Sequence, residues 1–98
     1  SNMWIMYKDR VIKFEEINIG ETYVSVYNVA EDAYFTVAKY EKPEQAQLAL
    51  SLIARAISEG KKVFRMPNQA EIETASIGSI TDYAMIYNFC TTRFEAVR

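Results

Sequence analysis

The sequence predicts an α+β fold, in which an antiparallel meander sheet of about five strands carries a central helix on one face and a second helix at the C-terminus. Two observations lead to this prediction. Short segments rich in Val, Ile, Tyr and Thr alternate with polar turns over the first 40 residues, as they do in antiparallel strands. A single longer segment with apolar residues at helical spacing follows them. The expected element order is therefore ββββαβ, followed by a helix.

We expect a single domain over residues 3–98. The chain has 98 residues, of which 50% are hydrophobic, and this suits one compact core but not two. Ser1 and Asn2 precede Met3 and resemble the remnant of a cleaved expression tag, so they are left out of the domain. Residues 68–98 are expected to form a C-terminal extension that packs on the rest.

Four strands are expected before the helix. The apolar runs 3–8 and 11–19 are joined by a short polar turn, which predicts a hairpin. In the second run the apolar positions change from one side of the strand to the other, so we expect a β-bulge at residues 15–16. Segments 22–29 and 34–40 also have the composition of strands and are expected to form a second hairpin.

The central helix is the clearest element, because Pro43 suits its first turn and Gly60 suits its end. Six apolar residues form one stripe that we expect to cover the sheet: Ala46, Ala49, Leu50, Ile53, Ala56 and Ile57. Leu48 and Leu52 lie next to each other outside this stripe. They are either ordinary exposed leucines or a second packing surface, covered by the C-terminal segment or by another subunit.

The region after the helix is expected to contain a short strand and a second helix. Residues 62–66 read as a strand that ends at Pro67, and further along Ser79 and Asp82 have the spacing of a helix capping box. Apolar side chains then recur at helical spacing: Tyr83, Ile86, Tyr87, Cys90, Phe94 and Val97. Residues 85–94 are also rich in Tyr, Phe and Thr, so a terminal strand stays an alternative.

The residues that are missing exclude several kinds of chemistry. The chain has no histidine, so it lacks the usual general base near neutral pH and the commonest metal ligand. Its 3 glycines are too far apart for a phosphate-binding loop, and Cys90, the single cysteine, reads as a buried structural residue. The adjacent pairs Glu15-Glu16 and Glu31-Asp32 would point to opposite faces of a strand and read as solvated. We therefore expect no catalytic, cofactor or metal site.

Charge and hydropathy limit the location and the partners that we expect. The net charge is −2 and the basic residues are scattered along the chain, which argues against a nucleic-acid partner. No apolar run is long enough for a membrane span, and the N-terminus does not read as a secretory leader. With a single cysteine, an internal disulfide is excluded. These features predict a cytoplasmic protein that does not contact a membrane.

Several short segments resemble a group of small uncharacterised proteins of Gram-positive bacteria and their prophages. The segments are Met3-Trp4-Ile5, Asp9-Arg10, Tyr40 ahead of the helix, and Phe64-Arg65-Met66-Pro67. The resemblance covers roughly residues 3–67, and it departs from the group at Met6 and Tyr7, where polar residues are common. It implies a prophage association but no function. The segment 68–98 would then be an elaboration in which an individual function was added.

The tyrosines suggest where a partner could bind. Tyr23 and Tyr27 share one strand face, Tyr34 and Tyr40 share another, and the basic residues placed near them are Lys39, Lys13 and Arg65. Such an aromatic sheet surface could stack nucleobases, but tyrosine is also favoured in strands and at protein interfaces, and this second interpretation is preferred.

We therefore interpret the chain as a non-catalytic binding or assembly module, with another protein or a second copy in a homodimer as its partner. We expect no small-molecule ligand and no cofactor. The candidate interaction residues are Leu48, Leu52, Tyr83, Tyr87, Phe94, Tyr23 and Tyr27. Two alternatives stay open: single-stranded nucleic-acid binding through an aromatic sheet face, and a small carboxylate-dependent enzyme.

Overall fold

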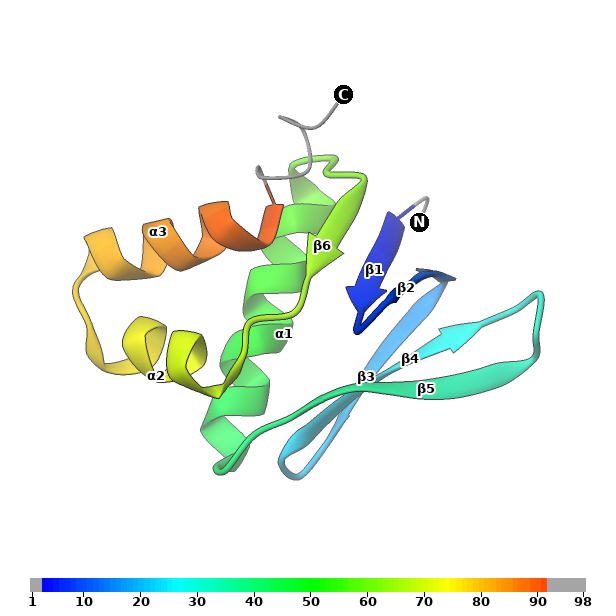
Figure 1. Cartoon of the computed structure of the whole chain (residues 1–98), viewed down its shortest axis with the longest axis horizontal. Helices are drawn as coiled ribbons and strands as arrows, with labels where there is room; N and C mark the ends of the chain where they lie inside the picture. Colours follow the sequence, from blue (N-terminus) through cyan, green and yellow to red (C-terminus); the bar gives the residue numbers. More distant parts are fainter. Residues whose placement is uncertain (1–2, 92–98) are drawn as a thin grey trace.

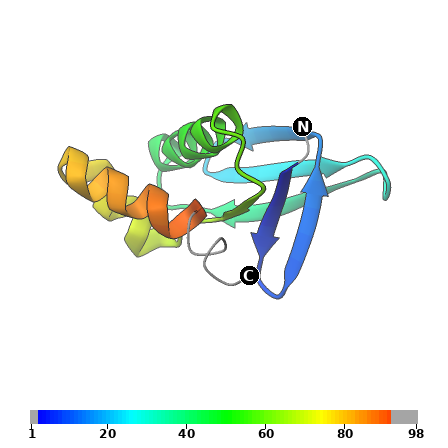
Figure 2. The ribbon, with the colours of Figure 1, turned by 90° about the horizontal axis from the view of Figure 1, so that it is seen from above.

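The structure, a computed structural model, describes residues 3–91 and is α+β, as the sequence predicts (Figure 1). The described residues contain six strands and three helices. The strands are β1 (Met3–Tyr7), β2 (Arg10–Phe14), β3 (Glu16–Gly20), β4 (Tyr23–Asn28), β5 (Ala33–Lys39) and β6 (Val63–Arg65). The helices are α1 (Pro43–Ser58), α2 (Gln69–Ile77) and α3 (Ile80–Thr91). Figure 2 shows the helices gathered on one side of the molecule and the strands on the other.

The strands form two three-stranded sheets instead of one meander, and this corrects the predicted topology. The orders are β2-β1-β6 and β3-β4-β5. The expected bulge at Glu15 and Glu16 is a corner at which the chain leaves the first sheet and enters the second, with Glu15 between the two strands. Backbone N–H of Glu15 donates to Tyr27 O over 3.0 Å, and its carboxylate accepts from Val29 N over 2.9 Å. The apolar residues therefore do change from one side of the chain to the other at this point, but the reason is that the chain passes from one sheet to the next.

The strand after α1 returns to the beginning of the chain. β6 pairs with β1 in parallel, with Trp4 opposite Val63 and Met6 opposite Arg65, while β2 pairs with β1 on the other side. Trp4 N also donates to Lys62 O over 2.8 Å. The first strand is therefore the central strand of its sheet, and both of its backbone edges are used.

Helix α1 has the predicted bounds, with Pro43 first and Gly60, at a positive φ of 72°, just beyond its end. Its buried face is wider than the predicted stripe and turned relative to it. Leu52, placed outside the stripe, is completely buried, whereas Ile57 is 39% exposed and Leu50 is partly exposed. The reason is that α1 contacts both the sheet β3-β4-β5 and helix α2, so two sides of the helix are covered.

The C-terminal segment forms two helices, of which α3 was predicted and α2 was not. Ser79 and Asp82 form the expected capping interaction: Ser79 N donates to Asp82 Oδ2 over 3.0 Å, and Asp82 N donates to Ser79 Oγ over 3.2 Å. The alternative of a strand from residue 85 is wrong for the described part, and Phe94 and Val97 lie outside the described residues. Helix α2 begins with a second capping box, formed by Asn68 and Glu71, that was overlooked in the sequence.

Exchange of Ile53 for Asp should unfold the protein, whereas exchange of Ile57 should not. Ile53 is completely buried, so Ile53→Asp places an unpaired carboxylate in the core and should lower the free energy of unfolding by more than about 4 kcal/mol. Ile57→Asp adds the same charge to the same helix at a side chain that is 39% exposed, and should cost less than about 1 kcal/mol. Urea unfolding followed by circular dichroism measures both. Equal losses would contradict the observed helix orientation.

Candidate ligand-binding face

The outer face of the sheet β2-β1-β6 carries an exposed tryptophan. Alternation along β1 places Met3 and Ile5 in the core, so Trp4 and Met6 point to the opposite side. Their neighbours across the strands are Lys13 and Val63 for Trp4, and Val11 and Arg65 for Met6. We call these six residues the Trp4 face: Trp4, Met6, Val11, Lys13, Val63 and Arg65. Trp4 is 40% exposed and Val11 is 49% exposed, whereas the other four residues are partly exposed, so the face combines accessible apolar side chains with two basic ones.

A hollow of about 460 Å³ adjoins this face where β1 ends. We call it the basic hollow. Twelve residues line it: Met6, Tyr7, Lys8, Val37, Ala38, Lys39, Tyr40, Arg65, Met66, Pro67, Asn68 and Gln69. Three of them are basic and none is acidic. Met6 and Arg65 belong to both the Trp4 face and the hollow, so the two are continuous.

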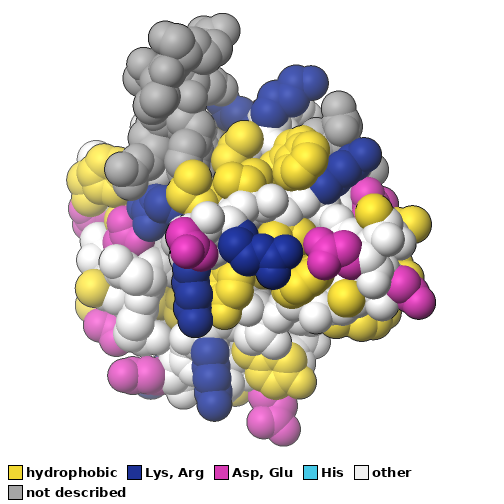
Figure 3. All heavy atoms as spheres, turned by 45° about the vertical axis from the view of Figure 1, so that its right-hand side comes forward, with side chains coloured by type: hydrophobic (Ala, Val, Ile, Leu, Met, Phe, Trp, Pro, Cys, Tyr) yellow, Lys and Arg dark blue, Asp and Glu magenta, His cyan; other side chains and the backbone are white. Residues whose placement is uncertain are grey.

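Figure 3 shows a side of the molecule on which hydrophobic side chains lie directly beside several Lys and Arg side chains. This arrangement is not visible from the net charge of −2. Several acidic residues line a second hollow, of about 400 Å³, between the beginning of α1 and α2: Glu41, Glu44 and Glu73. The two hollows therefore differ in charge, although Lys42 also lines the second one.

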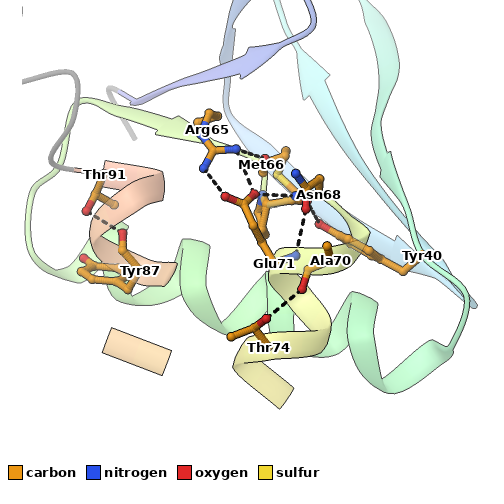
Figure 4. A network of polar contacts seen from close by, with 10 residues as sticks. Tyr40, Arg65, Met66, Asn68, Ala70, Glu71, Thr74, Tyr87 and Thr91 are labelled. Carbon is orange, nitrogen blue, oxygen red and sulfur yellow. Dashed lines mark hydrogen bonds and ion pairs between the residues drawn. The ribbon is translucent and has the colours of Figure 1, made fainter. Parts of the chain in front are cut away.

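Polar contacts, one of them buried and the others partly or fully exposed, link the residues in the wall of the basic hollow (Figure 4). The Tyr40 hydroxyl donates to Pro67 O over 2.8 Å, and burial raises the pKa of Tyr40 well above its usual value. Arg65 donates to both carboxylate oxygens of Glu71, over 3.1 and 2.8 Å. Glu71 also accepts from Asn68 N over 2.9 Å, which ties the guanidinium to the N-terminus of α2. The hydrogen bonds to Glu71 raise the pKa of Arg65. Arg65 is therefore a rigid, permanently charged part of the wall.

The predicted tyrosine surface is present on the other sheet, but it differs from the prediction in one residue. Tyr23, Tyr27 and Tyr34 point outward from β4 and β5, and the rings of Tyr27 and Tyr34 are 4.8 Å apart. Tyr40 does not join them, since it is only 4% exposed. A register shift in the β4–β5 pair changes the side to which the end of β5 points, and the sequence carries no clear sign of it.

The tyrosine surface also has different charges from those expected. Of the three predicted flanking residues, only Lys39 lies on this sheet, opposite Tyr23, whereas Lys13 and Arg65 lie on the Trp4 face. The Tyr27 hydroxyl donates to the carboxylate of Asp32, and this contact is the largest cause of the raised pKa of Tyr27. A carboxylate therefore occupies the position where a nucleic acid would need a cation.

The other predicted interaction residues contribute mainly to the core. Leu52 is completely buried and Leu48 packs against the core, so the chain itself covers them and no second copy is needed for this. Tyr83 is also partly buried against the core, and Phe94 lies outside the described residues. Tyr23, with 42% exposure, is therefore the most accessible of the described candidates.

Tyr87, at 2% exposure, is a link between helices and not a surface residue. Its hydroxyl donates to Glu59 over 2.6 Å, and the Arg55 guanidinium lies 4.0 Å from its ring centre. The hydrogen bond from Tyr87 is also the largest cause that lowers the pKa of Glu59. These contacts join α3 to the end of α1.

The remaining features that bear on function are metal ligands, membrane spans, the paired carboxylates and Cys90. Among residues 3–91, no cluster of three or more carboxylates or thiols could hold a metal ion, and no helix there is long and apolar enough to cross a membrane. The pairs Glu15-Glu16 and Glu31-Asp32 are exposed, as expected. Cys90 is completely buried, and this burial raises the pKa of its thiol to about 12.

Comparison of the chain with family models, with curated proteins and with solved structures gives no match. The candidate site therefore rests on its own geometry. Trp4 was noticed in the sequence only as part of a short motif, and its position on an open face was not inferred. The alternation of Trp4 and Met6 with Met3 and Ile5 was the signal that could have revealed it.

The thiol of Cys90 should be unreactive in the folded protein over an unusually wide pH range. The folded state holds its thiol proton up to a pKa of about 12, whereas an exposed thiol ionises near pH 8.5. Reaction with a chromogenic disulfide reagent should therefore stay slow up to pH 10 in buffer and become fast above pH 8.5 in urea. The pKa of the thiol is higher in the folded than in the unfolded protein. Raising the pH above 8.5 therefore ionises the thiol of the unfolded protein first, and this lowers the free energy of unfolding. A native thiol that reacts as fast as the unfolded one would contradict its burial.

Proposed function

We propose that this chain is a non-catalytic binding module, and that it binds an anionic partner on the Trp4 face and in the basic hollow. One observation carries the proposal: a solvent-exposed tryptophan in the middle of a sheet lies next to a hollow with basic residues and no carboxylate in its lining. The short-motif resemblance brings no function with it, so the proposal depends on this surface alone.

The apolar part of the surface supports binding because it is contiguous. A single exposed apolar side chain is common and needs no explanation. Here Trp4 and Met6 are adjacent on β1, Val11 lies across from Met6, and Val63 lies across from Trp4. Cross-strand neighbours of this kind are about 5 Å apart, so the four side chains form one patch. Contiguous exposed patches are typical of binding sites.

The charged part supports an anionic partner. Lys8, Lys39 and Arg65 surround one concave space, and a concave surface of one sign concentrates the electric field. Arg65 is partly neutralised by Glu71, so the two lysines supply most of the attraction for an added anion. Lys13 extends the positive charge beside Trp4.

Catalysis is left out of the proposal for a chemical reason. The hollow contains lysine, arginine and tyrosine side chains but no carboxylate in its lining. The Tyr40 hydroxyl, with its raised pKa, is further from acid–base chemistry at neutral pH than an ordinary tyrosine. The small carboxylate-dependent enzyme is therefore the weaker alternative.

Self-assembly is a second candidate function, favoured by the turn between α2 and α3. Ile77 and Ile80 are 87% and 89% exposed there, which is costly for isoleucine in water. If copies associate through this turn, the wild-type chain should be larger than a monomer in light scattering, and the double variant Ile77→Gln, Ile80→Gln should be monomeric. A monomeric wild-type chain at high concentration would end this candidate.

Binding of the anionic partner can be tested with an immobilised sulfated polysaccharide. The wild-type chain should be retained in 20 mM salt despite its net charge, and Lys39→Glu or Lys13→Glu should be eluted at markedly lower salt. Lys42→Glu is the matched control, because Lys42 does not line the basic hollow and all three exchanges change the net charge from −2 to −4, one positive charge being replaced by one negative charge.

Retention of Lys42→Glu close to that of the wild type would support the local site. Arg65 is not exchanged, because its loss would leave Glu71 without its bidentate partner. Passage of the wild-type chain through the column without retention, or an equal effect of all three variants, would overturn the proposal.

A further inference from the structure

We infer that the anionic partner is a single-stranded nucleic acid, with one base stacked on Trp4 and its phosphates held by the lysines of the Trp4 face and the basic hollow. This inference rests on the proposed function and names the class of the ligand. It differs from the aromatic-face hypothesis of the sequence in its location, because it uses the other sheet.

The backbone of β1 shows why no peptide strand can be added beside Trp4. β1 pairs with β2 on one side and with β6 on the other, so its N–H and C=O groups face these neighbours. At Trp4 and Met6 the Trp4 face therefore offers side chains and no free backbone edge, and the open edges of this sheet lie on the outer sides of β2 and β6. Extended peptides are most often recognised by addition to a sheet edge, whereas bases are recognised by stacking on aromatic side chains of a sheet face.

The cations follow the direction of β1 from Trp4 to the hollow. Lys13 lies across from Trp4, Arg65 lies across from Met6, and Lys8 and Lys39 line the end of the track. At about 3.3 Å per residue, the three strand steps from Trp4 to Tyr7 span about 10 Å, and Lys8 follows in the turn. Positive charge along a groove beside an aromatic ring is the usual arrangement of proteins that bind single strands.

A single strand fits this surface better than a duplex. Bases in a duplex are stacked on one another and present no free ring face, whereas a single strand can place a base on Trp4 at no cost in base pairing. The neighbouring Met6 and Val63 provide apolar contacts for the sugar and the base edge. The only carboxylate that contacts these cations in the described structure is Glu71, which pairs with Arg65.

The tyrosine surface is a second aromatic surface in the same molecule and can be compared with the Trp4 face. It has more aromatic rings, but the carboxylates of Asp32 and Glu16 lie beside Tyr27, the first through a hydrogen bond and the second across the β3–β4 pair. Phosphates would be repelled there. The surroundings of Tyr27 therefore have the wrong sign for a nucleic acid, and the cation of this sheet, Lys39, lies opposite Tyr23 and also lines the basic hollow.

The chain contains 1 tryptophan and 7 tyrosines, so fluorescence excited at a wavelength that tyrosine does not absorb reports on the Trp4 face. Titration with a 12-mer of deoxythymidine should quench this fluorescence, because a stacked base contacts the ring. The affinity should fall about 100-fold between 20 and 200 mM salt if about three phosphates are neutralised, at a slope of about −0.7 per phosphate. A 12-mer of uridine tests whether RNA binds in the same way.

An abasic 12-mer separates the base from the phosphates. It carries the same backbone charge but has nothing to stack, so it should bind at least about 5-fold more weakly and leave the fluorescence unchanged. If the abasic strand binds as tightly as the thymidine strand, an anionic partner is still bound but the inference of a nucleic acid is wrong. If neither strand binds and the sulfated polysaccharide does not bind either, the proposed function fails as well.

Two variants locate the site, measured by anisotropy of a fluorescein-labelled thymidine 12-mer. Trp4→Leu keeps an apolar side chain but removes the ring, and it should weaken binding by about 5- to 100-fold. Tyr34→Leu is the control, since Tyr34 is 62% exposed on the other sheet, and it should have no effect. Circular dichroism melting checks that both variants are folded. An effect of Tyr34→Leu without an effect of Trp4→Leu would overturn the inference.

Discussion

The structure depends on the position of β1 between β2 and β6. Pairing on both sides consumes the backbone groups of the strand, and alternation of its side chains divides them between two environments. Met3 and Ile5 enter the core together with Phe64, which lies opposite Ile5. Trp4 and Met6 must then lie on the outside, whatever the rest of the chain does. The same constraint therefore stabilises the fold and presents the candidate binding face.

Long-range contacts create the basic hollow around this strand. Its lining comes from three stretches that are far apart in the sequence, at the ends of β1 and β5 and after β6. The hydrogen bond from Tyr40 to Pro67 joins the stretch after β5 to the stretch around the end of β6, which Arg65 attaches to α2 through Glu71. Pairing of Met6 with Arg65 joins the end of β1 to the same stretch. A chain with a net negative charge can in this way display a local positive surface, because binding depends on where charges are placed and not on their sum.

The candidate site was only partly predictable from the sequence. Lys13, Lys39 and Arg65 were expected beside the tyrosines, but only Lys39 lies on their sheet, and Lys13 and Arg65 lie on the other one. For Lys13 the assignment failed because strands β1 to β5 were expected in one sheet, and the corner at Glu15 places Lys13 and Tyr27 on different sheets. The leucines of α1 were expected to be either ordinary exposed residues or covered by the C-terminal segment or another subunit. In the structure α2 provides a second contact for this helix, and the sequence interpretation had not identified α2.

The sequence by itself determined the local elements: the first hairpin, the bounds of α1, the short strand β6 and the capped start of α3. These depend on neighbours within a few residues, such as Pro43, Gly60 and the pair Ser79 and Asp82, whose conformational preferences act locally. Only the tertiary structure decided that the strands divide into two sheets, that β6 returns to β1, and that Trp4 lies beside the basic hollow. These features depend on which apolar surfaces of the whole chain bury each other. The sequence of a single segment does not determine this, because the free energy comes from contacts between distant segments.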